Sequence, residues 1–300
     1  MSEPPALAMP DVPGVAVEHR HIALPDGTRL HVAEAGAGSP LVLVHGWPQH
    51  WWAWRRLLEP LAQEHRVICP DLRGLGWSDA PPGRYEKEAW AADLDALLDA
   101  LDRERVDLAG HDWGGLVALL AALHAPGRVR TVAAVSIVHP WSRGPSPSPR
   151  ALAALAYQPA LALPVAGDHL LRRLPAFVRE LIRRGSHPAH RWSDAELDTY
   201  AEVLRQPARA RASSAIYRTF LTRELGAVAR GRYRDERLAM PTLIATGDAD
   251  PVVGARFMAG LDRHAGARAE THVVERAGHF VPEERPDALL ALLRAHVRAG

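Results

Sequence analysis

A charged side chain stands between closely spaced glycines near the middle of this 300-residue chain. Residues 110–114 read Gly-His-Asp-Trp-Gly and follow an apolar run of the kind that forms a buried strand. In the pattern G-x-S-x-G, a strand turns sharply into a helix and exposes a nucleophilic serine. Asp112 occupies the serine position here, and the glycines leave room for the chain to fold back. We therefore predict that Asp112 is a nucleophile at a strand-to-helix turn.

Two later segments supply an acid and a base. Residues 246–251 read Thr-Gly-Asp-Ala-Asp-Pro after one apolar run, and residues 277–280 read Ala-Gly-His-Phe after the last. Nucleophile, acid and histidine follow this order in proteins built around such a turn. We predict that His279 is the base and that Asp250 orients its imidazole to accept a proton from water. Asp250 lies further beyond the strand end and can reach the histidine, while Asp248 is the alternative acid.

A third segment predicts donors for a developing negative charge. Residues 45–48 read His-Gly-Trp-Pro directly after an apolar run. From this position the backbone N–H of Trp47 would pair with that of Trp113 as an oxyanion hole, although an ordinary turn at Pro48 is the alternative. We also expect a substrate pocket lined by His45, Trp47, Trp113 and Trp141. Tryptophans near a pocket favour a small apolar or aromatic substrate.

The carboxylate nucleophile restricts the reaction. A carboxylate that attacks an ester gives a reactive anhydride, whereas displacement at a saturated carbon gives an ester that water can cleave. We therefore predict that Asp112 forms a bond to carbon, and that water activated by His279 hydrolyses the resulting ester. This chemistry requires neither a cofactor nor a metal.

The elements around these motifs predict a mostly parallel sheet with helices on both faces, because short apolar runs alternate with helical patterns. Four continuous apolar runs are typical of buried parallel strands, two more strands follow later in the chain, and two further segments flank the turn at residues 25–27 as a hairpin. The predicted strands are residues 15–21, 29–34, 40–45, 66–70, 106–110, 129–138, 241–246 and 270–275. The predicted helices are residues 51–63, 86–101, 115–124, 254–264 and 286–298.

The segment 141–237 has a different pattern. It begins with a loop rich in Gly, Pro and Ser at residues 144–149 and shows no strand-like alternation afterwards. Ser193 and Glu196 form a capping box that marks one helix start. We predict an all-helical cap inserted between two strands of a core formed by residues 1–140 and 238–300. Residues 1–14, rich in Pro and Ala, are expected to be a loose tail.

Composition argues against several classes of partner. The net charge is +1, so no overall field attracts nucleic acid or an anionic membrane. Cys69 is the one cysteine, which fits a reducing compartment. No apolar run approaches the roughly 18–20 residues that span a bilayer, and the N-terminus lacks the pattern of a signal peptide. We expect a soluble, cytoplasmic protein that is a monomer or a homodimer.

The chain resembles the soluble epoxide hydrolases of the α/β-hydrolase family from about Val15 to its C-terminus. The motifs that carry the resemblance are residues 45–48, 71–79 (Asp-Leu-Arg-Gly-Leu-Gly-Trp-Ser-Asp), 111–115 and 278–280. The resemblance implies the α/β-hydrolase fold with an eight-stranded sheet, a cis peptide before Pro48, and hydrolysis of an epoxide to a vicinal diol. It also implies two cap tyrosines that protonate the opening epoxide. Their relative positions favour Tyr157 and Tyr217, with Tyr200 as the alternative to Tyr157.

Two other functions are compatible with the same fold. Haloalkane dehalogenases share the aspartate nucleophile but need side-chain donors for the departing halide, typically a Trp beside the nucleophile and a second Trp or an Asn. This chain contains no Asn, so a cap tryptophan, Trp141 or Trp192, would have to serve. A non-catalytic ligand-binding protein is also possible on fold grounds, but such a protein is expected to have lost a triad residue. Epoxide hydrolysis is therefore the predicted function.

Overall fold

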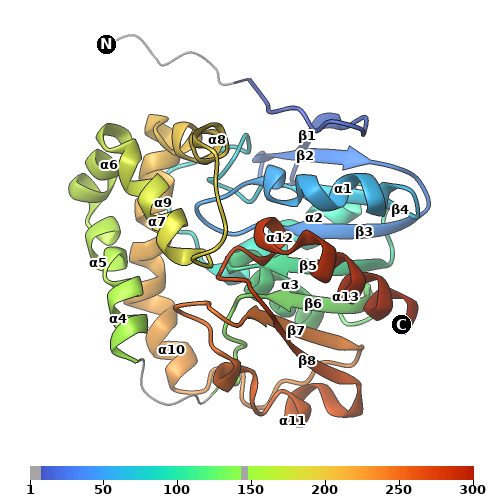
Figure 1. Cartoon of the computed structure of the whole chain (residues 1–300). Coiled ribbons are helices and arrows are strands. Elements are labelled where there is room, and N and C mark those ends of the chain that lie inside the picture. The colour runs from blue at the N-terminus through green and yellow to red at the C-terminus, as the bar shows by residue number, and fades with distance from the viewer. Residues whose placement is uncertain (1–7, 143–147) are drawn as a thin grey trace.

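The computed structural model describes residues 8–142 and 148–300. Part of the predicted N-terminal tail, residues 1–7, and part of the predicted loop, residues 143–147, lie outside the described residues. The chain forms one eight-stranded sheet in the order β1-β2-β4-β3-β5-β6-β7-β8 (Figure 1). The strands are β1 (Glu18–Ala23), β2 (Arg29–Ala35), β3 (Ser39–Val44), β4 (His65–Pro70), β5 (Val106–His111), β6 (Val129–Val135), β7 (Thr242–Gly247) and β8 (Ala269–Val274).

Strand direction confirms the predicted mostly parallel sheet. β2 runs antiparallel to both β1 and β4, so the expected hairpin of β1 and β2 is present. Every other neighbouring pair, from β4 across to β8, is parallel. All residues of β5 and β7 are buried, whereas the edge strands β1 and β8 are largely exposed. Continuous apolar runs occur in the central strands because helices cover both of their faces.

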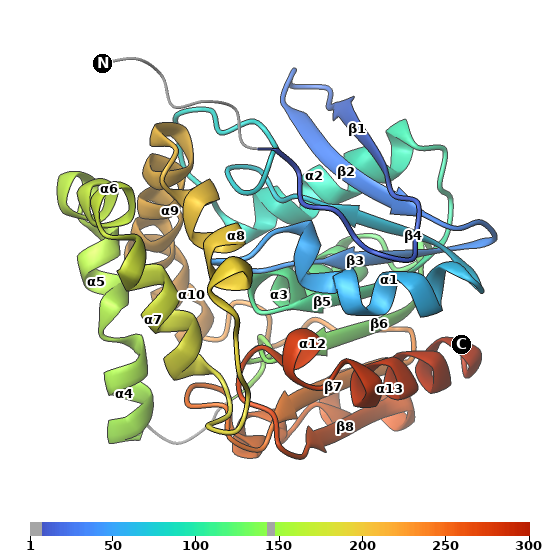
Figure 2. The same ribbon diagram turned by 45° about the horizontal axis from the view of Figure 1, so that its top comes forward.

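Two hydrophobic cores lie on the two faces of the sheet. Along β3, Leu41 and Leu43 belong to one core while Val42 and Val44 belong to the other, as the alternation of side chains in a strand requires. The helices α1 (Arg55–Ala62) and α13 (Pro286–Arg298) close the first core, and α2 (Lys87–Ala100) and α3 (Trp113–His124) close the second. Figure 2 shows α1 and α13 in front of the sheet, with α2 and α3 behind.

Between β6 and β7, every described regular element is helical. These elements group together at one side of the sheet (Figure 1), and their apolar side chains, such as Leu171, Ile182 and Ile216, continue the second core. The predicted capping box is present, with both reciprocal hydrogen bonds of Ser193 and Glu196. The elements are α4 (Pro149–Leu155), α5 (Tyr157–Ala162), α6 (Pro164–Arg173), α7 (Pro175–Gly185), α8 (Asp194–Leu204), α9 (Pro207–Thr219), the π-helical turn η2 (Phe220–Glu224) and α10 (Leu225–Ala229).

Some predicted boundaries were wrong. The strand expected to run to residue 138 ends at Val135, because Ser136 has a φ of 52° and leaves the extended conformation. The helix expected over residues 254–264 consists of two short pieces, η3 (Ala255–Met258) and α11 (Asp262–Ala265). None of the helices in residues 8–142 and 148–300 is both long and apolar enough to cross a membrane.

Candidate active site

Asp112 stands at a strained turn between β5 and α3. Its backbone has φ 52° and ψ −128°, a conformation that non-glycine residues rarely adopt outside functional turns. A Cβ at Gly110 would overlap the carbonyl of Gly114, and a Cβ at Gly114 would overlap the carbonyl of Val44. Glycine is therefore required at both positions for α3 to begin directly after Asp112. The predicted strand-to-helix turn is present.

His279 lies between two carboxylates, which are brought to one edge of the sheet by parallel strands. Its Nε2 is 3.5 Å from Asp112 Oδ1, and its Nδ1 is 3.0 Å from Asp250 Oδ2. The other carboxylate oxygen of Asp250 accepts the backbone N–H groups of Val252 and Val253 at 2.8 and 2.9 Å. Asp248 instead accepts the backbone N–H of Ala277 at 3.1 Å. Of the two candidate acids, the structure brings Asp250 to the histidine.

The two carboxylates control the protonation of His279. Burial alone acts to lower the pKa of the imidazole, but the charge of Asp250 and the hydrogen bonds to Asp112 and Asp250 outweigh burial and raise the pKa to about 10. An imidazolium donates a proton from each nitrogen, so the protonated ring satisfies both carboxylates at once. His279 is therefore a cation at neutral pH.

The loop after β3 supplies a donor to the Asp112 carboxylate. The backbone N–H of Trp47 donates to Asp112 Oδ2 at 3.0 Å, and the Trp47–Pro48 peptide bond is cis, as the resemblance implied. A Cβ at Gly46 would overlap the Asp112 side chain, so glycine leaves space for the carboxylate. Among the described residues, the backbone N–H that bonds the Asp112 carboxylate is that of Trp47 and not that of Trp113, the second predicted donor.

Two tyrosines from the helical segment meet above this donor. The hydroxyls of Tyr157 and Tyr217 are 3.0 Å apart. The indole of Trp47 stacks on the Tyr157 ring, with 5.7 Å between ring centroids, and meets the Tyr217 ring edge-on at 5.1 Å. Burial raises the pKa of both phenols, and the nearby charge of Asp112 raises it further. Both hydroxyls therefore keep their protons and can donate them.

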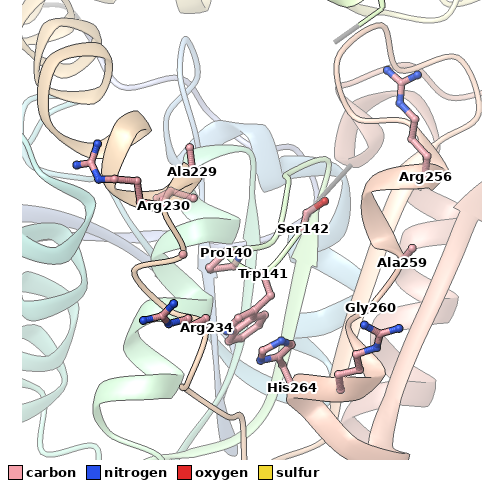
Figure 3. Close-up of a pocket in the computed structure, with 13 residues that line it drawn as sticks. Pro140, Trp141, Ser142, Ala229, Arg230, Arg234, Arg256, Ala259, Gly260 and His264 are labelled. Atoms are coloured by element: carbon pink, nitrogen blue, oxygen red, sulfur yellow. The ribbon is translucent and has the colours of Figure 1, made fainter. Parts of the chain in front are cut away.

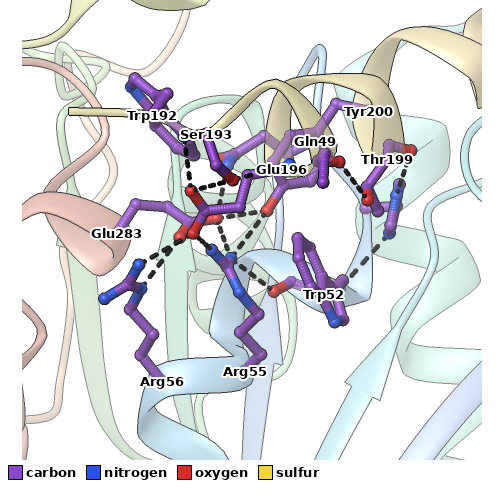
Figure 4. A network of polar contacts seen from close by, with 12 residues as sticks. Gln49, Trp52, Arg55, Arg56, Trp192, Ser193, Glu196, Thr199, Tyr200 and Glu283 are labelled. Carbon is purple, nitrogen blue, oxygen red and sulfur yellow. Dashed lines mark hydrogen bonds and ion pairs between the residues drawn. The ribbon is translucent and has the colours of Figure 1, made fainter. Parts of the chain in front are cut away.

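Tyr200, the alternative to Tyr157, belongs to a different cluster. Its buried hydroxyl donates to the carboxylate of Glu283, which also accepts from Arg55. Arg55 in turn donates to Glu196 at 2.6 Å, so this network joins α1 and α12 (Val281–Glu284) to α8 (Figure 4). Tyr200 is thus held away from the pair that Tyr157 forms with Tyr217.

Two residues predicted to line the substrate pocket have other surroundings. His45 is buried, its Nδ1–H donates to the carbonyl of Gly46 at 3.0 Å, and its Nε2 accepts the backbone N–H of Leu72 at 3.0 Å. Burial lowers the pKa of this ring, and a neutral imidazole with both nitrogens bonded inside the protein has no group left for a substrate. The prediction for His45 therefore needs correction: it fixes the loop that carries Trp47.

Trp141 also lies elsewhere. Its indole N–H donates to the carbonyl of Tyr233 at 2.6 Å, and its ring stacks on His264 with 4.7 Å between centroids. It lines a groove between α10 and the segment that follows β7 (Figure 3). Neither Asp112 nor the tyrosine pair contributes to that groove. The structure therefore does not bring Trp141 together with the other predicted site residues.

Two residues that bond the backbone at or beside His279 were not singled out from the sequence. The Nε2–H of His111 donates to the backbone carbonyl of His279 at 2.8 Å, and burial lowers the His111 pKa to about 4, so its ring is neutral. Glu284 accepts backbone N–H groups on either side of His279. The position of His111 beside the nucleophile was a usable signal, whereas nothing in the sequence distinguishes Glu284 from Glu283.

Within the described chain, no cluster of three or more His, Cys, Asp or Glu side chains could hold a metal ion.

Comparisons with known proteins identify the family of this chain. The family described as alpha/beta hydrolase fold matches residues 39–286. The chain belongs to the α/β-hydrolase family. A soluble epoxide hydrolase from Corynebacterium sp. (strain C12) is 30% identical over 280 residues, which cover 90% of this α/β-hydrolase and 94% of that protein.

Two further relatives define how far the similarity extends. The structure titled epoxide hydrolase CorEH without ligand has a TM-score of 0.83 and 26% identity, covering 95% of this chain and 99% of that chain. A 2-hydroxy-6-oxo-2,4-heptadienoate hydrolase from Pseudomonas putida is 38% identical over 128 residues, which are 41% of this chain and 46% of that protein. The similarity to epoxide hydrolases therefore includes the helical segment as well as the sheet.

Proposed function

We propose that this α/β-hydrolase is an epoxide hydrolase that opens a small apolar or aromatic epoxide to a vicinal diol through a covalent ester on Asp112. The observation that carries the proposal is the tyrosine pair. Two protonated phenols 3.0 Å apart pack against Trp47, whose backbone N–H bonds the Asp112 carboxylate. An epoxide held between the tyrosine pair and the Asp112 carboxylate has a nucleophile at its carbon and proton donors at its oxygen. General acid help of this kind is typically worth about 10²–10⁴ in rate.

In the first step, an Asp112 oxygen attacks one epoxide carbon and the bond from that carbon to the ring oxygen breaks. The developing alkoxide takes a proton from Tyr157 or Tyr217. The products of this step are an alkyl ester on Asp112, a neutral hydroxyl group on the bound intermediate, and a tyrosinate. Positive charge remains on His279.

The ester then makes His279 a base. Esterification removes the charge of Asp112, one of the two carboxylates that raise the His279 pKa. The imidazolium therefore loses its proton more readily. This proton passes through water to the tyrosinate, which becomes a neutral tyrosine again. Neutral His279 accepts a proton from a water molecule that attacks the ester carbonyl carbon, the diol leaves, and Asp112 and the imidazolium are restored. The sum of the steps is epoxide plus water giving diol.

Backbone N–H groups stabilise the oxyanion that forms during ester hydrolysis. Trp47 already donates to one oxygen of the Asp112 carboxylate at 3.0 Å. We propose that Trp113 supplies the second donor when water attacks the ester and the former carbonyl oxygen becomes the oxyanion of the tetrahedral intermediate. Removal of one such donor typically costs about 3–4 kcal/mol of barrier. Residues 141–237 act as the cap in this proposal, because both proton-donating tyrosines come from that segment.

Dehalogenation is less well supported because the indole groups that could hold a halide have other partners. The Trp141 indole N–H donates to the Tyr233 carbonyl at 2.6 Å, and that of Trp192 donates to the Ser186 hydroxyl at 2.8 Å. The Trp47 indole N–H donates to the Ser213 hydroxyl at 3.1 Å. A non-catalytic role does not account for an assembled Asp112–His279–Asp250 array.

The test compares products from two substrate classes. The purified protein is incubated with styrene oxide and, separately, with 1-bromobutane, and diol and bromide are measured. We expect phenylethanediol from the epoxide, no bromide above background, and no diol with an Asp112→Asn variant. Release of bromide without diol from any of a panel of aryl and alkyl epoxides would contradict the proposal.

A further inference from the structure

Glu284 is a buried carboxylate whose ligands are all backbone N–H groups. Its Oε2 accepts from His187 at 2.6 Å and from Gly278 at 2.9 Å, and its Oε1 accepts from Phe280 at 2.9 Å. Among the described residues, the groups that act most strongly on its pKa are these three backbone N–H groups and His279, with no lysine or arginine among them. Burial raises the pKa of this carboxyl, while its three backbone hydrogen bonds and the charge of His279 oppose the rise and favour the ionised form, whose hydrogen bonds are the stronger kind.

These three donors come from two segments that are far apart in the sequence. Gly278 and Phe280 flank His279, and His187 follows α7 in the helical segment. Between the two flanking bonds, the N–H of His279 itself donates to the carbonyl of Gly185 at 2.7 Å. Three consecutive N–H groups around the base are therefore bonded either to Glu284 or to the end of α7.

The main chain at the end of α7 is in direct contact with the main chain of the loop that carries His279. A Cβ at Gly278 would overlap the Gly185 carbonyl, and a Cβ at Gly185 would press against the Phe280 ring. On the opposite side, the carbonyl of His279 accepts from His111, which precedes the nucleophile. The backbone of His279 is thus held from one side by the helical segment and from the other by the nucleophile strand.

We propose that Glu284 is a positioning residue that ties the helical segment to the His279 loop and thereby sets the distance from the imidazole to the ester on Asp112. The inference rests on the proposed function, since it concerns the hydrolysis step of that reaction. Glu284 touches neither the tyrosine pair nor the Asp112 carboxylate, so its effect is specific to the step in which His279 acts as a base.

A carboxylate is required at this position because it accepts at both oxygens. Glutamine has nearly the same shape but offers one acceptor oxygen and one NH2 donor. If the amide oxygen takes the place of Oε2, the NH2 group faces the Phe280 N–H, and in the reverse orientation it faces the N–H groups of His187 and Gly278. Either orientation leaves at least one buried N–H unpaired, which is unfavourable.

The adjacent glutamate provides a matched control. Glu283 lies on the same short helix, is also buried, and bonds the helical segment through Tyr200 and Arg55 (Figure 4). Its backbone N–H donates to the Phe280 carbonyl at 2.9 Å, but the described side-chain partners of its carboxylate are Gln49, Arg55 and Tyr200, and none of them belongs to residues 278–280. Glu283→Gln therefore changes a buried acid at the neighbouring position without altering the bonds around the base.

The test separates the two chemical steps by rapid mixing and acid quench, with mass spectrometry of the alkylated protein. For Glu284→Gln we expect the rate of ester hydrolysis to fall by about tenfold or more, with the rate of alkylation within about twofold of the original, so that more ester accumulates. For Glu283→Gln we expect both rates within about twofold. Glu284→Asp, which keeps two acceptor oxygens, is expected to retain more of the hydrolysis rate than Glu284→Gln.

Equal loss of both rates in Glu284→Gln, or no change in either, would overturn the positioning role. If Glu284→Gln does not fold, the same comparison is made with Glu284→Asp, where a hydrolysis rate slowed no more than the alkylation rate would overturn it. An unsubstituted protein that forms diol without any ester on Asp112 would overturn the proposed mechanism itself, and this inference with it.

Discussion

The hydroxyl groups of Tyr157 and Tyr217 lie 3.0 Å apart, although 60 positions separate them in the sequence. Tyr157 begins α5 and Tyr217 lies in α9, and these two helices pack against each other. The Trp47 ring contacts both phenols. This contact connects the helical segment with the loop that donates to Asp112.

Substitution of Tyr217 tests the proton donors. Tyr217→Phe removes one hydroxyl while the ring continues to pack against Trp47 and Trp113. We expect the alkylation rate to fall by about tenfold or more, because one of two general acids is lost. Rapid-quench measurement of the ester on Asp112 checks this, with Tyr200→Phe as the control that leaves alkylation unchanged. An unaltered alkylation rate in Tyr217→Phe would remove Tyr217 from the site.

Removal of the base should trap the intermediate. His279→Gln retains a polar side chain but cannot accept a proton from water, so Asp112 can be alkylated while hydrolysis stops. We expect intact-protein mass spectrometry to show a single adduct with the full mass of the epoxide, located on the peptide that contains Asp112. Complete turnover without an adduct would show that His279 is not the base.

The charge of Asp112 should control the ionisation of His279. Attraction by Asp250 and Asp112 raises the His279 pKa to about 10, so removal of the Asp112 charge should lower it. NMR titration of the imidazole is expected to give a lower pKa in Asp112→Asn than in the unsubstituted protein, once mass spectrometry has verified that the amide is intact. An unchanged pKa would mean that the two side chains are not electrostatically coupled.

The same pKa shift has a consequence for stability. The folded-state pKa of His279 lies above the value of about 6.5 expected for the unfolded chain, so the imidazolium stabilises the fold fully below that pH. This contribution is lost as the pH rises through the interval towards 10. Urea unfolding at several pH values should therefore show a smaller loss of stability between pH 7 and 10 in Asp112→Asn than in the unsubstituted protein.

Asp71 should contribute to stability at the other end of the pH range. Its buried carboxylate accepts the N–H groups of Trp51 and Trp77 at 2.7 and 2.9 Å and lies 2.8 Å from His31 Nδ1. Burial acts to raise the pKa of this carboxyl, but the hydrogen bond from His31 and the electrostatic effect of that ring outweigh burial and lower the pKa below its ordinary value. Its stabilising effect is thus present above about pH 4 and is lost as the pH falls further. Asp71→Ala should lower the free energy of unfolding at pH 7 by about 3–5 kcal/mol, as measured by urea denaturation.

Local sequence predicted most of the sheet and the proximity of Asp112, Asp250 and His279, while their roles in catalysis stay a proposal. Apolar runs bounded by glycine and proline mark the strands, and Asp112, Asp250 and His279 each lie within a few residues of a strand end. Parallel strands bring these positions to one edge, so their proximity follows from topology. The choice of Asp250 over Asp248 also followed from the distance beyond the strand end.

Residues whose surroundings depend on packing over long distances were harder to predict. Trp141 stacks on His264 rather than lying near Asp112. No local sequence pattern determines which distant residues a tryptophan packs against. His45 is bonded to Leu72, 27 positions away. Glu284 accepts a hydrogen bond from the backbone N–H of His187, 97 positions away. Such a contact exists only once the helical segment has packed against the sheet.

The most direct measurement is a single turnover of an aryl epoxide in ¹⁸O-labelled water with the protein in excess. Attack by Asp112 predicts that the diol contains no ¹⁸O and that one ¹⁸O atom appears in the peptide carrying Asp112. Label in the diol, with none in that peptide, would mean that water attacks the epoxide directly and that no bond forms between Asp112 and carbon.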